Sequence, residues 1–306
     1  MQLSIYNYHY YREEVYNSGI YPINEESFRR QLEYLSRHYI FISQKELVHL
    51  LKSKTHTNKN YCLITFDDGL KEQMRAFSVL KELGIPAIFY VSSDPLQNKK
   101  CVDVHKIHYI RSEMSDVDLF EALENSFGIS SYKFNLNVLR NQYLYDDDLS
   151  RKIKYYLNFV LKSKQREDFI NKIFFSLINE EAEFAKSLYM SKEDVLELDK
   201  AGMFGTHSST HQPLANLVTE EKIEKDIIDS INYFDSLGVK NIKSISYPYG
   251  GATAVNKTVT DVSKNLGFEF GLTMMRGVNC NQEIFDFKFN LKRNSCSDLN
   301  NDENYE

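Results

Sequence analysis

The chain has 306 residues, of which 42% are hydrophobic and 26% are charged, and its formal net charge is −6. This length and composition predict a globular protein with enough chain for one α/β domain and an insertion. The negative charge and the absence of any basic run exclude the clustered positive surface that nucleic acids require. No apolar stretch is long enough to span a bilayer. We therefore predict no nucleic-acid partner and no transmembrane segment.

The start of the chain and its cysteines indicate a reducing compartment. Residues 1–6 enter a predicted strand directly, without the basic and apolar regions of a signal peptide, so we expect a cytoplasmic protein. The cysteines lack a C-x-x-C spacing, which favours free thiols over a disulfide framework or a sulfur-ligated metal. They are Cys62, Cys101, Cys280 and Cys296.

The first predicted elements bring a histidine to a strand end. Residues 3–8 alternate in polarity and are rich in Tyr and Ile, which predicts a strand that ends at His9. Helical spacing and capping residues predict helices over 24–38 and 43–51, with a strand over 39–42 between them. A histidine after a strand can reach a site formed by several strand ends. The histidine of an isolated Tyr-His pair is more often packed in the core or hydrogen-bonded locally.

The next predicted strand, residues 61–66, is almost continuously apolar, and Asp67, Asp68 and Gly69 follow it. Such a run suits a parallel strand that helices cover on both faces. The carboxyl ends of these strands are where α/β sheets and barrels place their chemistry. Two adjacent carboxylates repel one another unless a cation holds them. We therefore expect a divalent cation on one carboxylate, with the other left as a base.

A predicted helix over 70–83 and a strand over 87–91 complete a strand–helix–strand unit, which is typical of a parallel sheet. The segment 99–189 then shows helical spacing of apolar residues, without proline and almost without glycine. It is longer than a barrel connection needs to be, so we predict a helical insertion. It could cover the substrate as a lid or form a dimer face. Within it, His105 and His108 are better explained by local hydrogen bonds than by a metal.

The second half of the chain supplies further ligands. A helix over 191–200 and a short strand lead to His207-Ser208-Ser209-Thr210-His211, in which a turn can point both imidazoles the same way. Two histidines four apart are a weak signal alone, because most such pairs lie on solvated surfaces. Together with an aspartate they make a catalytic metal pattern, since three protein ligands leave a position for water.

The last predicted elements complete the alternation of strands and helices. They are a helix over 219–237, strands over 242–247 and 268–273 with a helix over 253–266 between them, a last strand over 284–293, and a mobile tail over 298–306.

At this point the sequence resembles the polysaccharide deacetylases of the NodB-homology type, carbohydrate esterase family 4. Thr65-Phe66-Asp67-Asp68-Gly69 is similar to the first motif of that family, and His207-Ser208-Ser209-Thr210-His211 to its second. Ser246-Tyr247-Pro248-Tyr249-Gly250 resembles the third. The resemblance implies a distorted (β/α) barrel made of residues 1–98 and 190–297, with the mostly helical insertion over 99–189.

The resemblance also implies a role for each residue. Asp67 would be the general base, and Asp68, His207 and His211 would hold one divalent metal. The backbone N–H of Tyr249 would donate to the oxyanion. Imidazole and carboxylate ligands favour Zn2+.

The sequence departs from the family in places. The arginine before the third motif, the Trp-containing fourth motif and the C-terminal Leu-x-His are absent, and the chain has no Trp. A permuted subgroup, similar to the deacetylases of biofilm poly-N-acetylglucosamine, carries its histidine in a Tyr-His pair near the N-terminus. Tyr8-His9 resembles that pair, so we predict His9 as the general acid. Arg293, in the last strand, could orient Asp67 or be a surface arginine.

The resemblance implies a metal-dependent hydrolase that removes an N-acetyl group from an amino sugar. Without a signal peptide, the expected substrate is a surface-polysaccharide or lipopolysaccharide precursor. The alternatives are an enzyme for another small amide, such as an N-formyl sugar, and an inactive glycan-binding protein. Aromatic residues near strand ends are the candidates for contacts with the sugar: Tyr10, Tyr11, Tyr90 and Tyr247.

Overall fold

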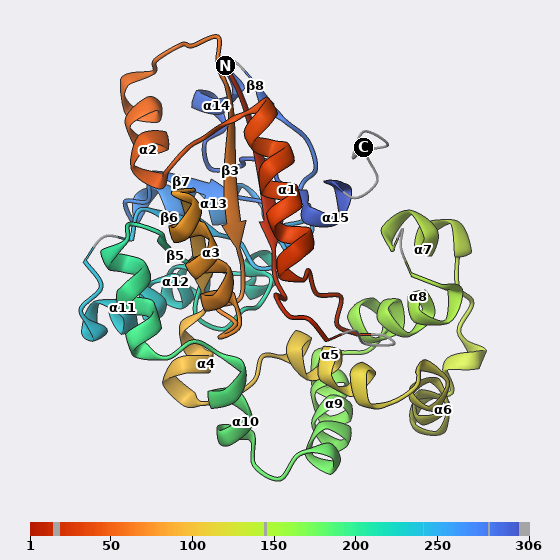
Figure 1. Ribbon diagram of the computed structural model, residues 1–306. Coiled ribbons are helices and arrows are strands. Elements are labelled where there is room, and N and C mark those ends of the chain that lie inside the picture. Colours follow the sequence, from red (N-terminus) through yellow and green to blue (C-terminus); the bar gives the residue numbers. More distant parts are fainter. Residues whose placement is uncertain (15–18, 144–145, 241, 281, 300–306) are drawn as a thin grey trace. The chain divides into compact units, whose positions relative to one another are not determined.

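The computed structural model describes residues 1–14, 19–143, 146–240, 242–280 and 282–299. The chain forms two compact units (Figure 1). Unit 1 comprises Met1–Glu13, Pro22–Lys100 and Ala185–Glu306, and unit 2 comprises Glu14–Tyr21 and Cys101–Phe184. In these ranges no helix is long and apolar enough to cross a membrane.

In the described residues, unit 1 is built on a mostly parallel sheet of nine strands with the path β7-β6-β5-β4-β3-β1-β8, and the only antiparallel strand pair among them is β1–β8. Two short strands lie off this path, since β2 pairs with β3 and β9 with β1. The strands are β1 Gln2–Tyr8, β2 Ile40–Phe41, β3 Asn60–Phe66, β4 Ala87–Val91, β5 Phe204–Thr206, β6 Ser244–Ser246, β7 Phe270–Leu272, β8 Asn279–Cys280 and β9 Asn294–Ser295.

The sheet curls, so that one late segment pairs with β7 at one end and with β1, the strand next to β8, near the other. Leu291 forms a parallel bridge with Leu272 of β7, and β9, three residues on, pairs with β1. The predicted fold class, a distorted (β/α) barrel, is therefore confirmed. The predicted strand over 284–293 is wrong, because Glu283–Asp286 form a helical turn that buries Ile284 and Phe285. Apolar side chains at adjacent positions suit a short buried helix as well as a strand.

Alternation along the strands separates two layers of side chains. On β1, Tyr6 and Tyr8 pack in the cluster under the helices, while Leu3 and Ile5 belong to a second cluster on the opposite face. Asn7 follows Leu3 and Ile5 by the strand period of two, so it lies on that second face at the carboxyl end. The apolar layer of the barrel interior therefore gives way to polar side chains where the strands end.

Helices α1, α3, α11 and α12 pack on the outer face of the sheet, with α1 and α3 beside β3 in Figure 1, whereas α2 and α14 pack in the second cluster. Five of the unit 1 helices begin at a side chain that caps the first turn, such as Ser43 of α2, which forms the predicted capping box with Glu46. The helices are α1 Glu25–His38, α2 Gln44–Ser53, α3 Gln73–Leu83, α4 Ser93–Asn98, α11 Lys192–Lys200, η3 Leu214–Leu217, α12 Glu220–Leu237, α13 Lys257–Asn265, α14 Glu283–Asp286 and α15 Cys296–Leu299. Residues 300–306 of the predicted tail lie outside the described part of the chain.

Unit 2 is helical in its described part. Its core forms where α5 packs on α9, with Ile107, Ile110, Ile170 and Phe174 buried. The elements are α5 Asp103–Glu113, α6 Asp116–Phe127, η1 Ile129–Ser131, α7 Leu136–Gln142, α8 Asp148–Tyr155, the π-helix η2 Tyr156–Val160 and α9 Ser163–Leu177, and α10 Glu181–Leu188 leads into unit 1. The predicted boundaries of the insertion, and its role as a lid or interface, stay predictions.

Candidate metal and catalytic site

The two adjacent aspartates after β3 point in different directions because the backbone changes conformation between them. The N–H of Asp67 still donates to Tyr8 O at 3.0 Å, as a strand residue does. Asp68 has φ +79° and Gly69 φ +66°, so the chain leaves the sheet there. A Cβ on Gly69 would lie 2.5 Å from Val91 Cγ1, which requires glycine at this turn. One carboxylate therefore enters the barrel interior while its neighbour turns away from it.

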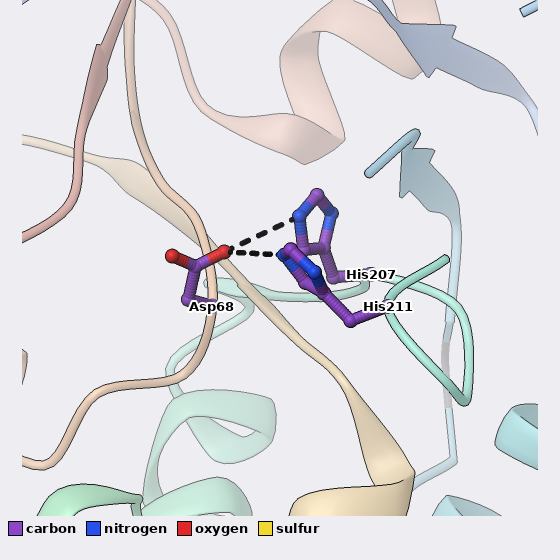
Figure 2. A group of neighbouring side chains, drawn as sticks. All are labelled: Asp68, His207 and His211. Carbon is purple, nitrogen blue, oxygen red and sulfur yellow. Dashed lines mark hydrogen bonds and ion pairs between the residues drawn. The ribbon is translucent and has the colours of Figure 1, made fainter. Parts of the chain in front are cut away.

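The second carboxylate, Asp68, meets two histidines from the loop after β5. Its Oδ1 lies 3.4 Å from His207 Nε2 and 3.0 Å from His211 Nε2 (Figure 2). All three side chains are buried, and one ligand atom from each lies within 4.8 Å of the others. The structure thus brings together the three residues that the sequence predicts as metal ligands.

The spacing of these atoms fits a metal ion. Two ligands that each lie about 2.0–2.1 Å from a tetrahedral ion are about 3.3 Å apart. The distances of 3.0 and 3.4 Å from Asp68 Oδ1 to the two imidazoles bracket this value. His207 Nδ1 is 2.8 Å from Ser246 O, a carbonyl that can only accept, so Nδ1 carries the proton and Nε2 keeps its lone pair for an ion. Burial lowers the pKa of His207, but attraction to Asp67 and the contact with Asp68 outweigh it and raise that pKa.

Asp67, unlike Asp68, is held by a buried arginine. Arg293 Nη1 donates to Asp67 Oδ1 at 2.9 Å and Nη2 to Oδ2 at 2.7 Å, and Arg293 is fully buried. Asn7 Nδ2 also donates to Oδ2 at 3.0 Å. Burial by itself raises the pKa of Asp67, yet attraction to Arg293 and His207 outweighs it and lowers the pKa to about 2. The carboxylate is therefore ionised, fixed in orientation, and able to accept a proton only at a lone pair that these donors leave open.

Polar side chains of the barrel interior complete this network. Arg293 Nη1 donates to Asn7 Oδ1 at 2.9 Å and Nη2 to Ser246 Oγ at 2.8 Å. Thr65 Oγ1 donates to Asn7 Oδ1 at 2.9 Å. The sequence analysis missed Asn7 and Ser246. The strand period contains a signal for Asn7, because it places a polar residue in line with Leu3 and Ile5 at a strand end.

His9 lies at the end of β1, exposed, and close enough to Asp67 for its charge to lower the pKa of that carboxyl group. Gln73 Nε2 donates both to His9 O at 2.9 Å and to Asp67 O at 2.6 Å, so one amide ties the two backbones together. The structure therefore brings His9 to the vicinity of the site. Its role as the general acid stays a prediction.

The four aromatic residues predicted to contact the sugar are all buried, whereas Tyr249, predicted for its backbone N–H, has an exposed ring. Tyr10, Tyr11, Tyr90 and Tyr247 are buried, and Tyr247 packs in a core cluster with Ile245, Val259 and Val262. Contact of the Tyr247 ring with a sugar does not fit this packing, because the strand alternation points Ser246 rather than Tyr247 at the site. Tyr249 is 41% exposed, and its ring centroid lies 5.5 Å from that of His211.

Backbone strain gathers at this site. Among the described residues, seven that are not glycine have positive φ, and four of them are Asp68, Ser208, His211 and Tyr249, with φ of 79°, 61°, 57° and 62°. Each such conformation costs on the order of 1–3 kcal/mol and persists only where neighbouring contacts enforce it. The strain lets three short loops aim their side chains and amides at one point.

Comparisons with known proteins agree with the motifs. Residues 158–271 match the family model "Polysaccharide deacetylase", and this segment contains His207, His211 and Tyr249 but neither aspartate. No curated protein matches the chain.

Solved structures share the fold. A Streptococcus pyogenes deacetylase, PplD, in complex with acetate is 17% identical, with a TM-score of 0.54, over 96% of this chain and 92% of the other. IcaB from Ammonifex degensii is 17% identical, with a TM-score of 0.57, over 95% and 90%. A de-N-acetylase from Aggregatibacter actinomycetemcomitans is 12% identical, with a TM-score of 0.56, over 96% and 94%.

Proposed function

We propose that the chain is a metal-dependent carbohydrate N-deacetylase of the NodB-homology type, carbohydrate esterase family 4, which the match of residues 158–271 to the polysaccharide deacetylase family model and the shared fold support. The observation that carries this proposal is the pairing of two neighbouring aspartates with different partners. Asp68 lies against His207 and His211, whereas Asp67 is fixed by Arg293. A site that only binds a glycan has no need for an oriented, ionised carboxylate beside its metal ligands.

The ligand set supports zinc. Asp68, His207 and His211 offer one carboxylate oxygen and two imidazole nitrogens, which is a donor set that zinc accepts while a fourth position stays open. A bound ion of this kind supplies an acidified water and a polarised acetyl carbonyl.

The protein groups then have separate tasks. Asp67 accepts a proton from the attacking water, and Arg293 holds the carboxylate in the orientation that this needs. The backbone N–H of Tyr249 donates to the oxyanion that develops on the acetyl oxygen. His9 gives a proton to the departing amine, which an amide requires because its unprotonated nitrogen leaves poorly.

We propose an N-acetylated amino sugar in a surface-polysaccharide or lipopolysaccharide precursor as the substrate. The exposed ring of Tyr249 beside His211 offers an aromatic face to such a sugar. A cytoplasmic location remains part of this proposal.

The experiment is a parallel assay of acetate and formate release from N-acetylated and N-formylated amino-sugar precursors. The zinc-loaded protein, a chelated sample and a zinc-restored sample are compared. We expect acetate release that is lost on chelation and restored by zinc. Formate release alone would establish the other amide activity. Glycan binding without release of either acid, by a zinc-loaded protein, would establish the inactive glycan-binding alternative and refute the proposal.

A further inference from the structure

The loop that carries both histidines is held from two sides. On its carbonyl side, the backbone N–H groups of Ser93 and Asp94 donate to Ser208 O at 3.2 Å and Ser209 O at 3.1 Å. The Oγ of Ser92 donates to His207 O at 2.9 Å. These contacts satisfy the carbonyl groups of the loop but leave its N–H groups to be paired elsewhere.

One carboxylate on α12 pairs the opposite side. Asp226 Oδ1 accepts from Ser209 N at 2.9 Å, and Oδ2 accepts from Thr210 N at 3.3 Å and Thr210 Oγ1 at 2.6 Å. Asp226 is 6% exposed, so these bonds are shielded from water. Both oxygens are used, and an ionised acceptor forms the stronger class of hydrogen bond.

The position of these bonds in the loop gives them their importance. Ser209 and Thr210 lie between the two histidines, and the residues that flank them, Ser208 and His211, have positive φ. A conformation of this kind relaxes unless neighbouring contacts enforce it. If the loop relaxed, His211 Nε2 would leave its position 3.0 Å from Asp68 Oδ1, and the three donors would no longer converge.

We propose that Asp226 is a positioning residue for the metal site, which holds the loop so that His207 and His211 meet Asp68. This inference rests on the proposed function for the presence of a metal. Asp226 does not contact the metal in this proposal. It contributes to the affinity for the metal by holding the ligands, whatever substrate the site acts on. Residues that orient metal ligands typically contribute about 10–100-fold to metal affinity.

The test measures the dissociation constant for Zn2+ by competition with a chromophoric chelator. Wild type is compared with Asp226→Asn, whose side chain keeps its size but offers one acceptor oxygen in place of two. We expect a dissociation constant about 10–100-fold higher in this variant. Asp229→Asn is the matched control, because Asp229 lies one turn further on α12 in an exposed pair with Lys225, and it should bind zinc as wild type does.

Two further measurements separate positioning from folding. Urea unfolding of the metal-free proteins shows whether Asp226→Asn is folded under the binding conditions. Thr210→Val removes one donor to Asp226 and keeps the carboxylate, so it should weaken zinc binding by less than Asp226→Asn does. If Asp226→Asn does not fold, the zinc affinity of Thr210→Val becomes the test. A wild-type dissociation constant in Thr210→Val would then overturn the inference.

The outcomes also separate this inference from the proposed function. Zinc binding by wild type with an unchanged dissociation constant in a folded Asp226→Asn variant overturns the role of Asp226 and leaves the proposed function standing. A wild-type protein that binds no zinc overturns both.

Discussion

Units 1 and 2 both contain an arginine that is almost fully buried against an aspartate. In unit 1, Arg293 Nη1 and Nη2 contact the two oxygens of Asp67 at 2.9 and 2.7 Å. In unit 2, Arg111 Nε and Nη2 contact the two oxygens of Asp116 at the same distances, 2.9 and 2.7 Å. The pair chemistry is therefore the same in both units.

The surroundings of the two pairs differ. Arg111 lies in the last turn of α5, and Asp116, five residues on, begins α6. Asp116 also accepts from Ser150 Oγ, so this pair ties α5 and α6 to α8 within a helical unit. Arg293 and Asp67 are 226 residues apart and meet at the strand ends of the barrel, beside the three metal-ligand candidates. A buried ion pair thus indicates function only through what lies next to it, because buried pairs also occur for structural reasons.

The largest expected effect distinguishes Asp67 from Asp116, the aspartates of the two buried pairs. Asp67→Asn should reduce acetate release by about four orders of magnitude, the upper end of the range for a general base, because an amide cannot accept the proton. Asp116→Asn should leave the turnover number of the folded protein unchanged and lower its stability by about 2 kcal/mol. Steady-state kinetics and urea unfolding of both variants check this. Equal losses of activity would mean that Asp67 acts only through folding.

His9→Ala should lower the rate by about two to four orders of magnitude, because the departing amine loses its proton donor. Its zinc content should stay at the wild-type level. His38→Ala is a control on the outer helix α1. Near-normal turnover of His9→Ala would remove His9 from the mechanism and transfer the role of general acid to another group.

Arg293→Lys sharpens the comparison between the arginines. Lysine keeps the charge but cannot make two parallel hydrogen bonds, so Asp67 would lose part of its orientation. We expect turnover to fall about 10–100-fold, with less effect on KM, which corresponds to one lost charge-assisted bond. Arg111→Lys should change stability and leave turnover intact. Reduced turnover in a folded Arg111→Lys variant would contradict the separation of the two pairs.

The smallest expected effect concerns pH and unit 2. Burial raises the pKa of Asp116, but its bonds with Arg111 and Ser150 outweigh that and lower it. A carboxyl group with a depressed pKa in the folded state stabilises the fold above its unfolded pKa, about 3.9, and loses this contribution as pH falls through the folded value. Wild type should therefore lose more stability than Asp116→Asn below about pH 4. If the free energy of unfolding fell equally with pH in the two proteins across that range, the pair of Arg111 and Asp116 would make no pH-dependent contribution to stability.

The sequence contained the local part of this site. Asp67, Asp68, His207 and His211 follow predicted strands, and the carboxyl ends of parallel strands converge, so their proximity was predictable. The contact between Arg293 and Asp67 was predicted only as one of two alternatives. Sequence patterns do not show which side chain crosses a barrel interior, and here the last segment is a helical turn followed by a bridge rather than the predicted strand.

Other residues of the site depend on tertiary packing that leaves little trace in the sequence. In the sequence, Asp226 is one of several acidic residues on a predicted amphipathic helix. Only the position of this helix in the fold shows that Asp226 faces the histidine loop. Tyr247 was predicted near the sugar because it lies at the end of a predicted strand. The alternation of β6 instead buries its ring and points Ser246 inward.

The central claim is that Asp68, His207 and His211 hold the metal while Asp67 stands beside it without binding it. Elemental analysis of four purified proteins tests this most directly: wild type, Asp67→Asn, His207→Ala and His211→Ala. The account predicts one zinc per chain in wild type and in Asp67→Asn, and none in either histidine variant. Zinc retained by both histidine variants, or lost from Asp67→Asn, would contradict it.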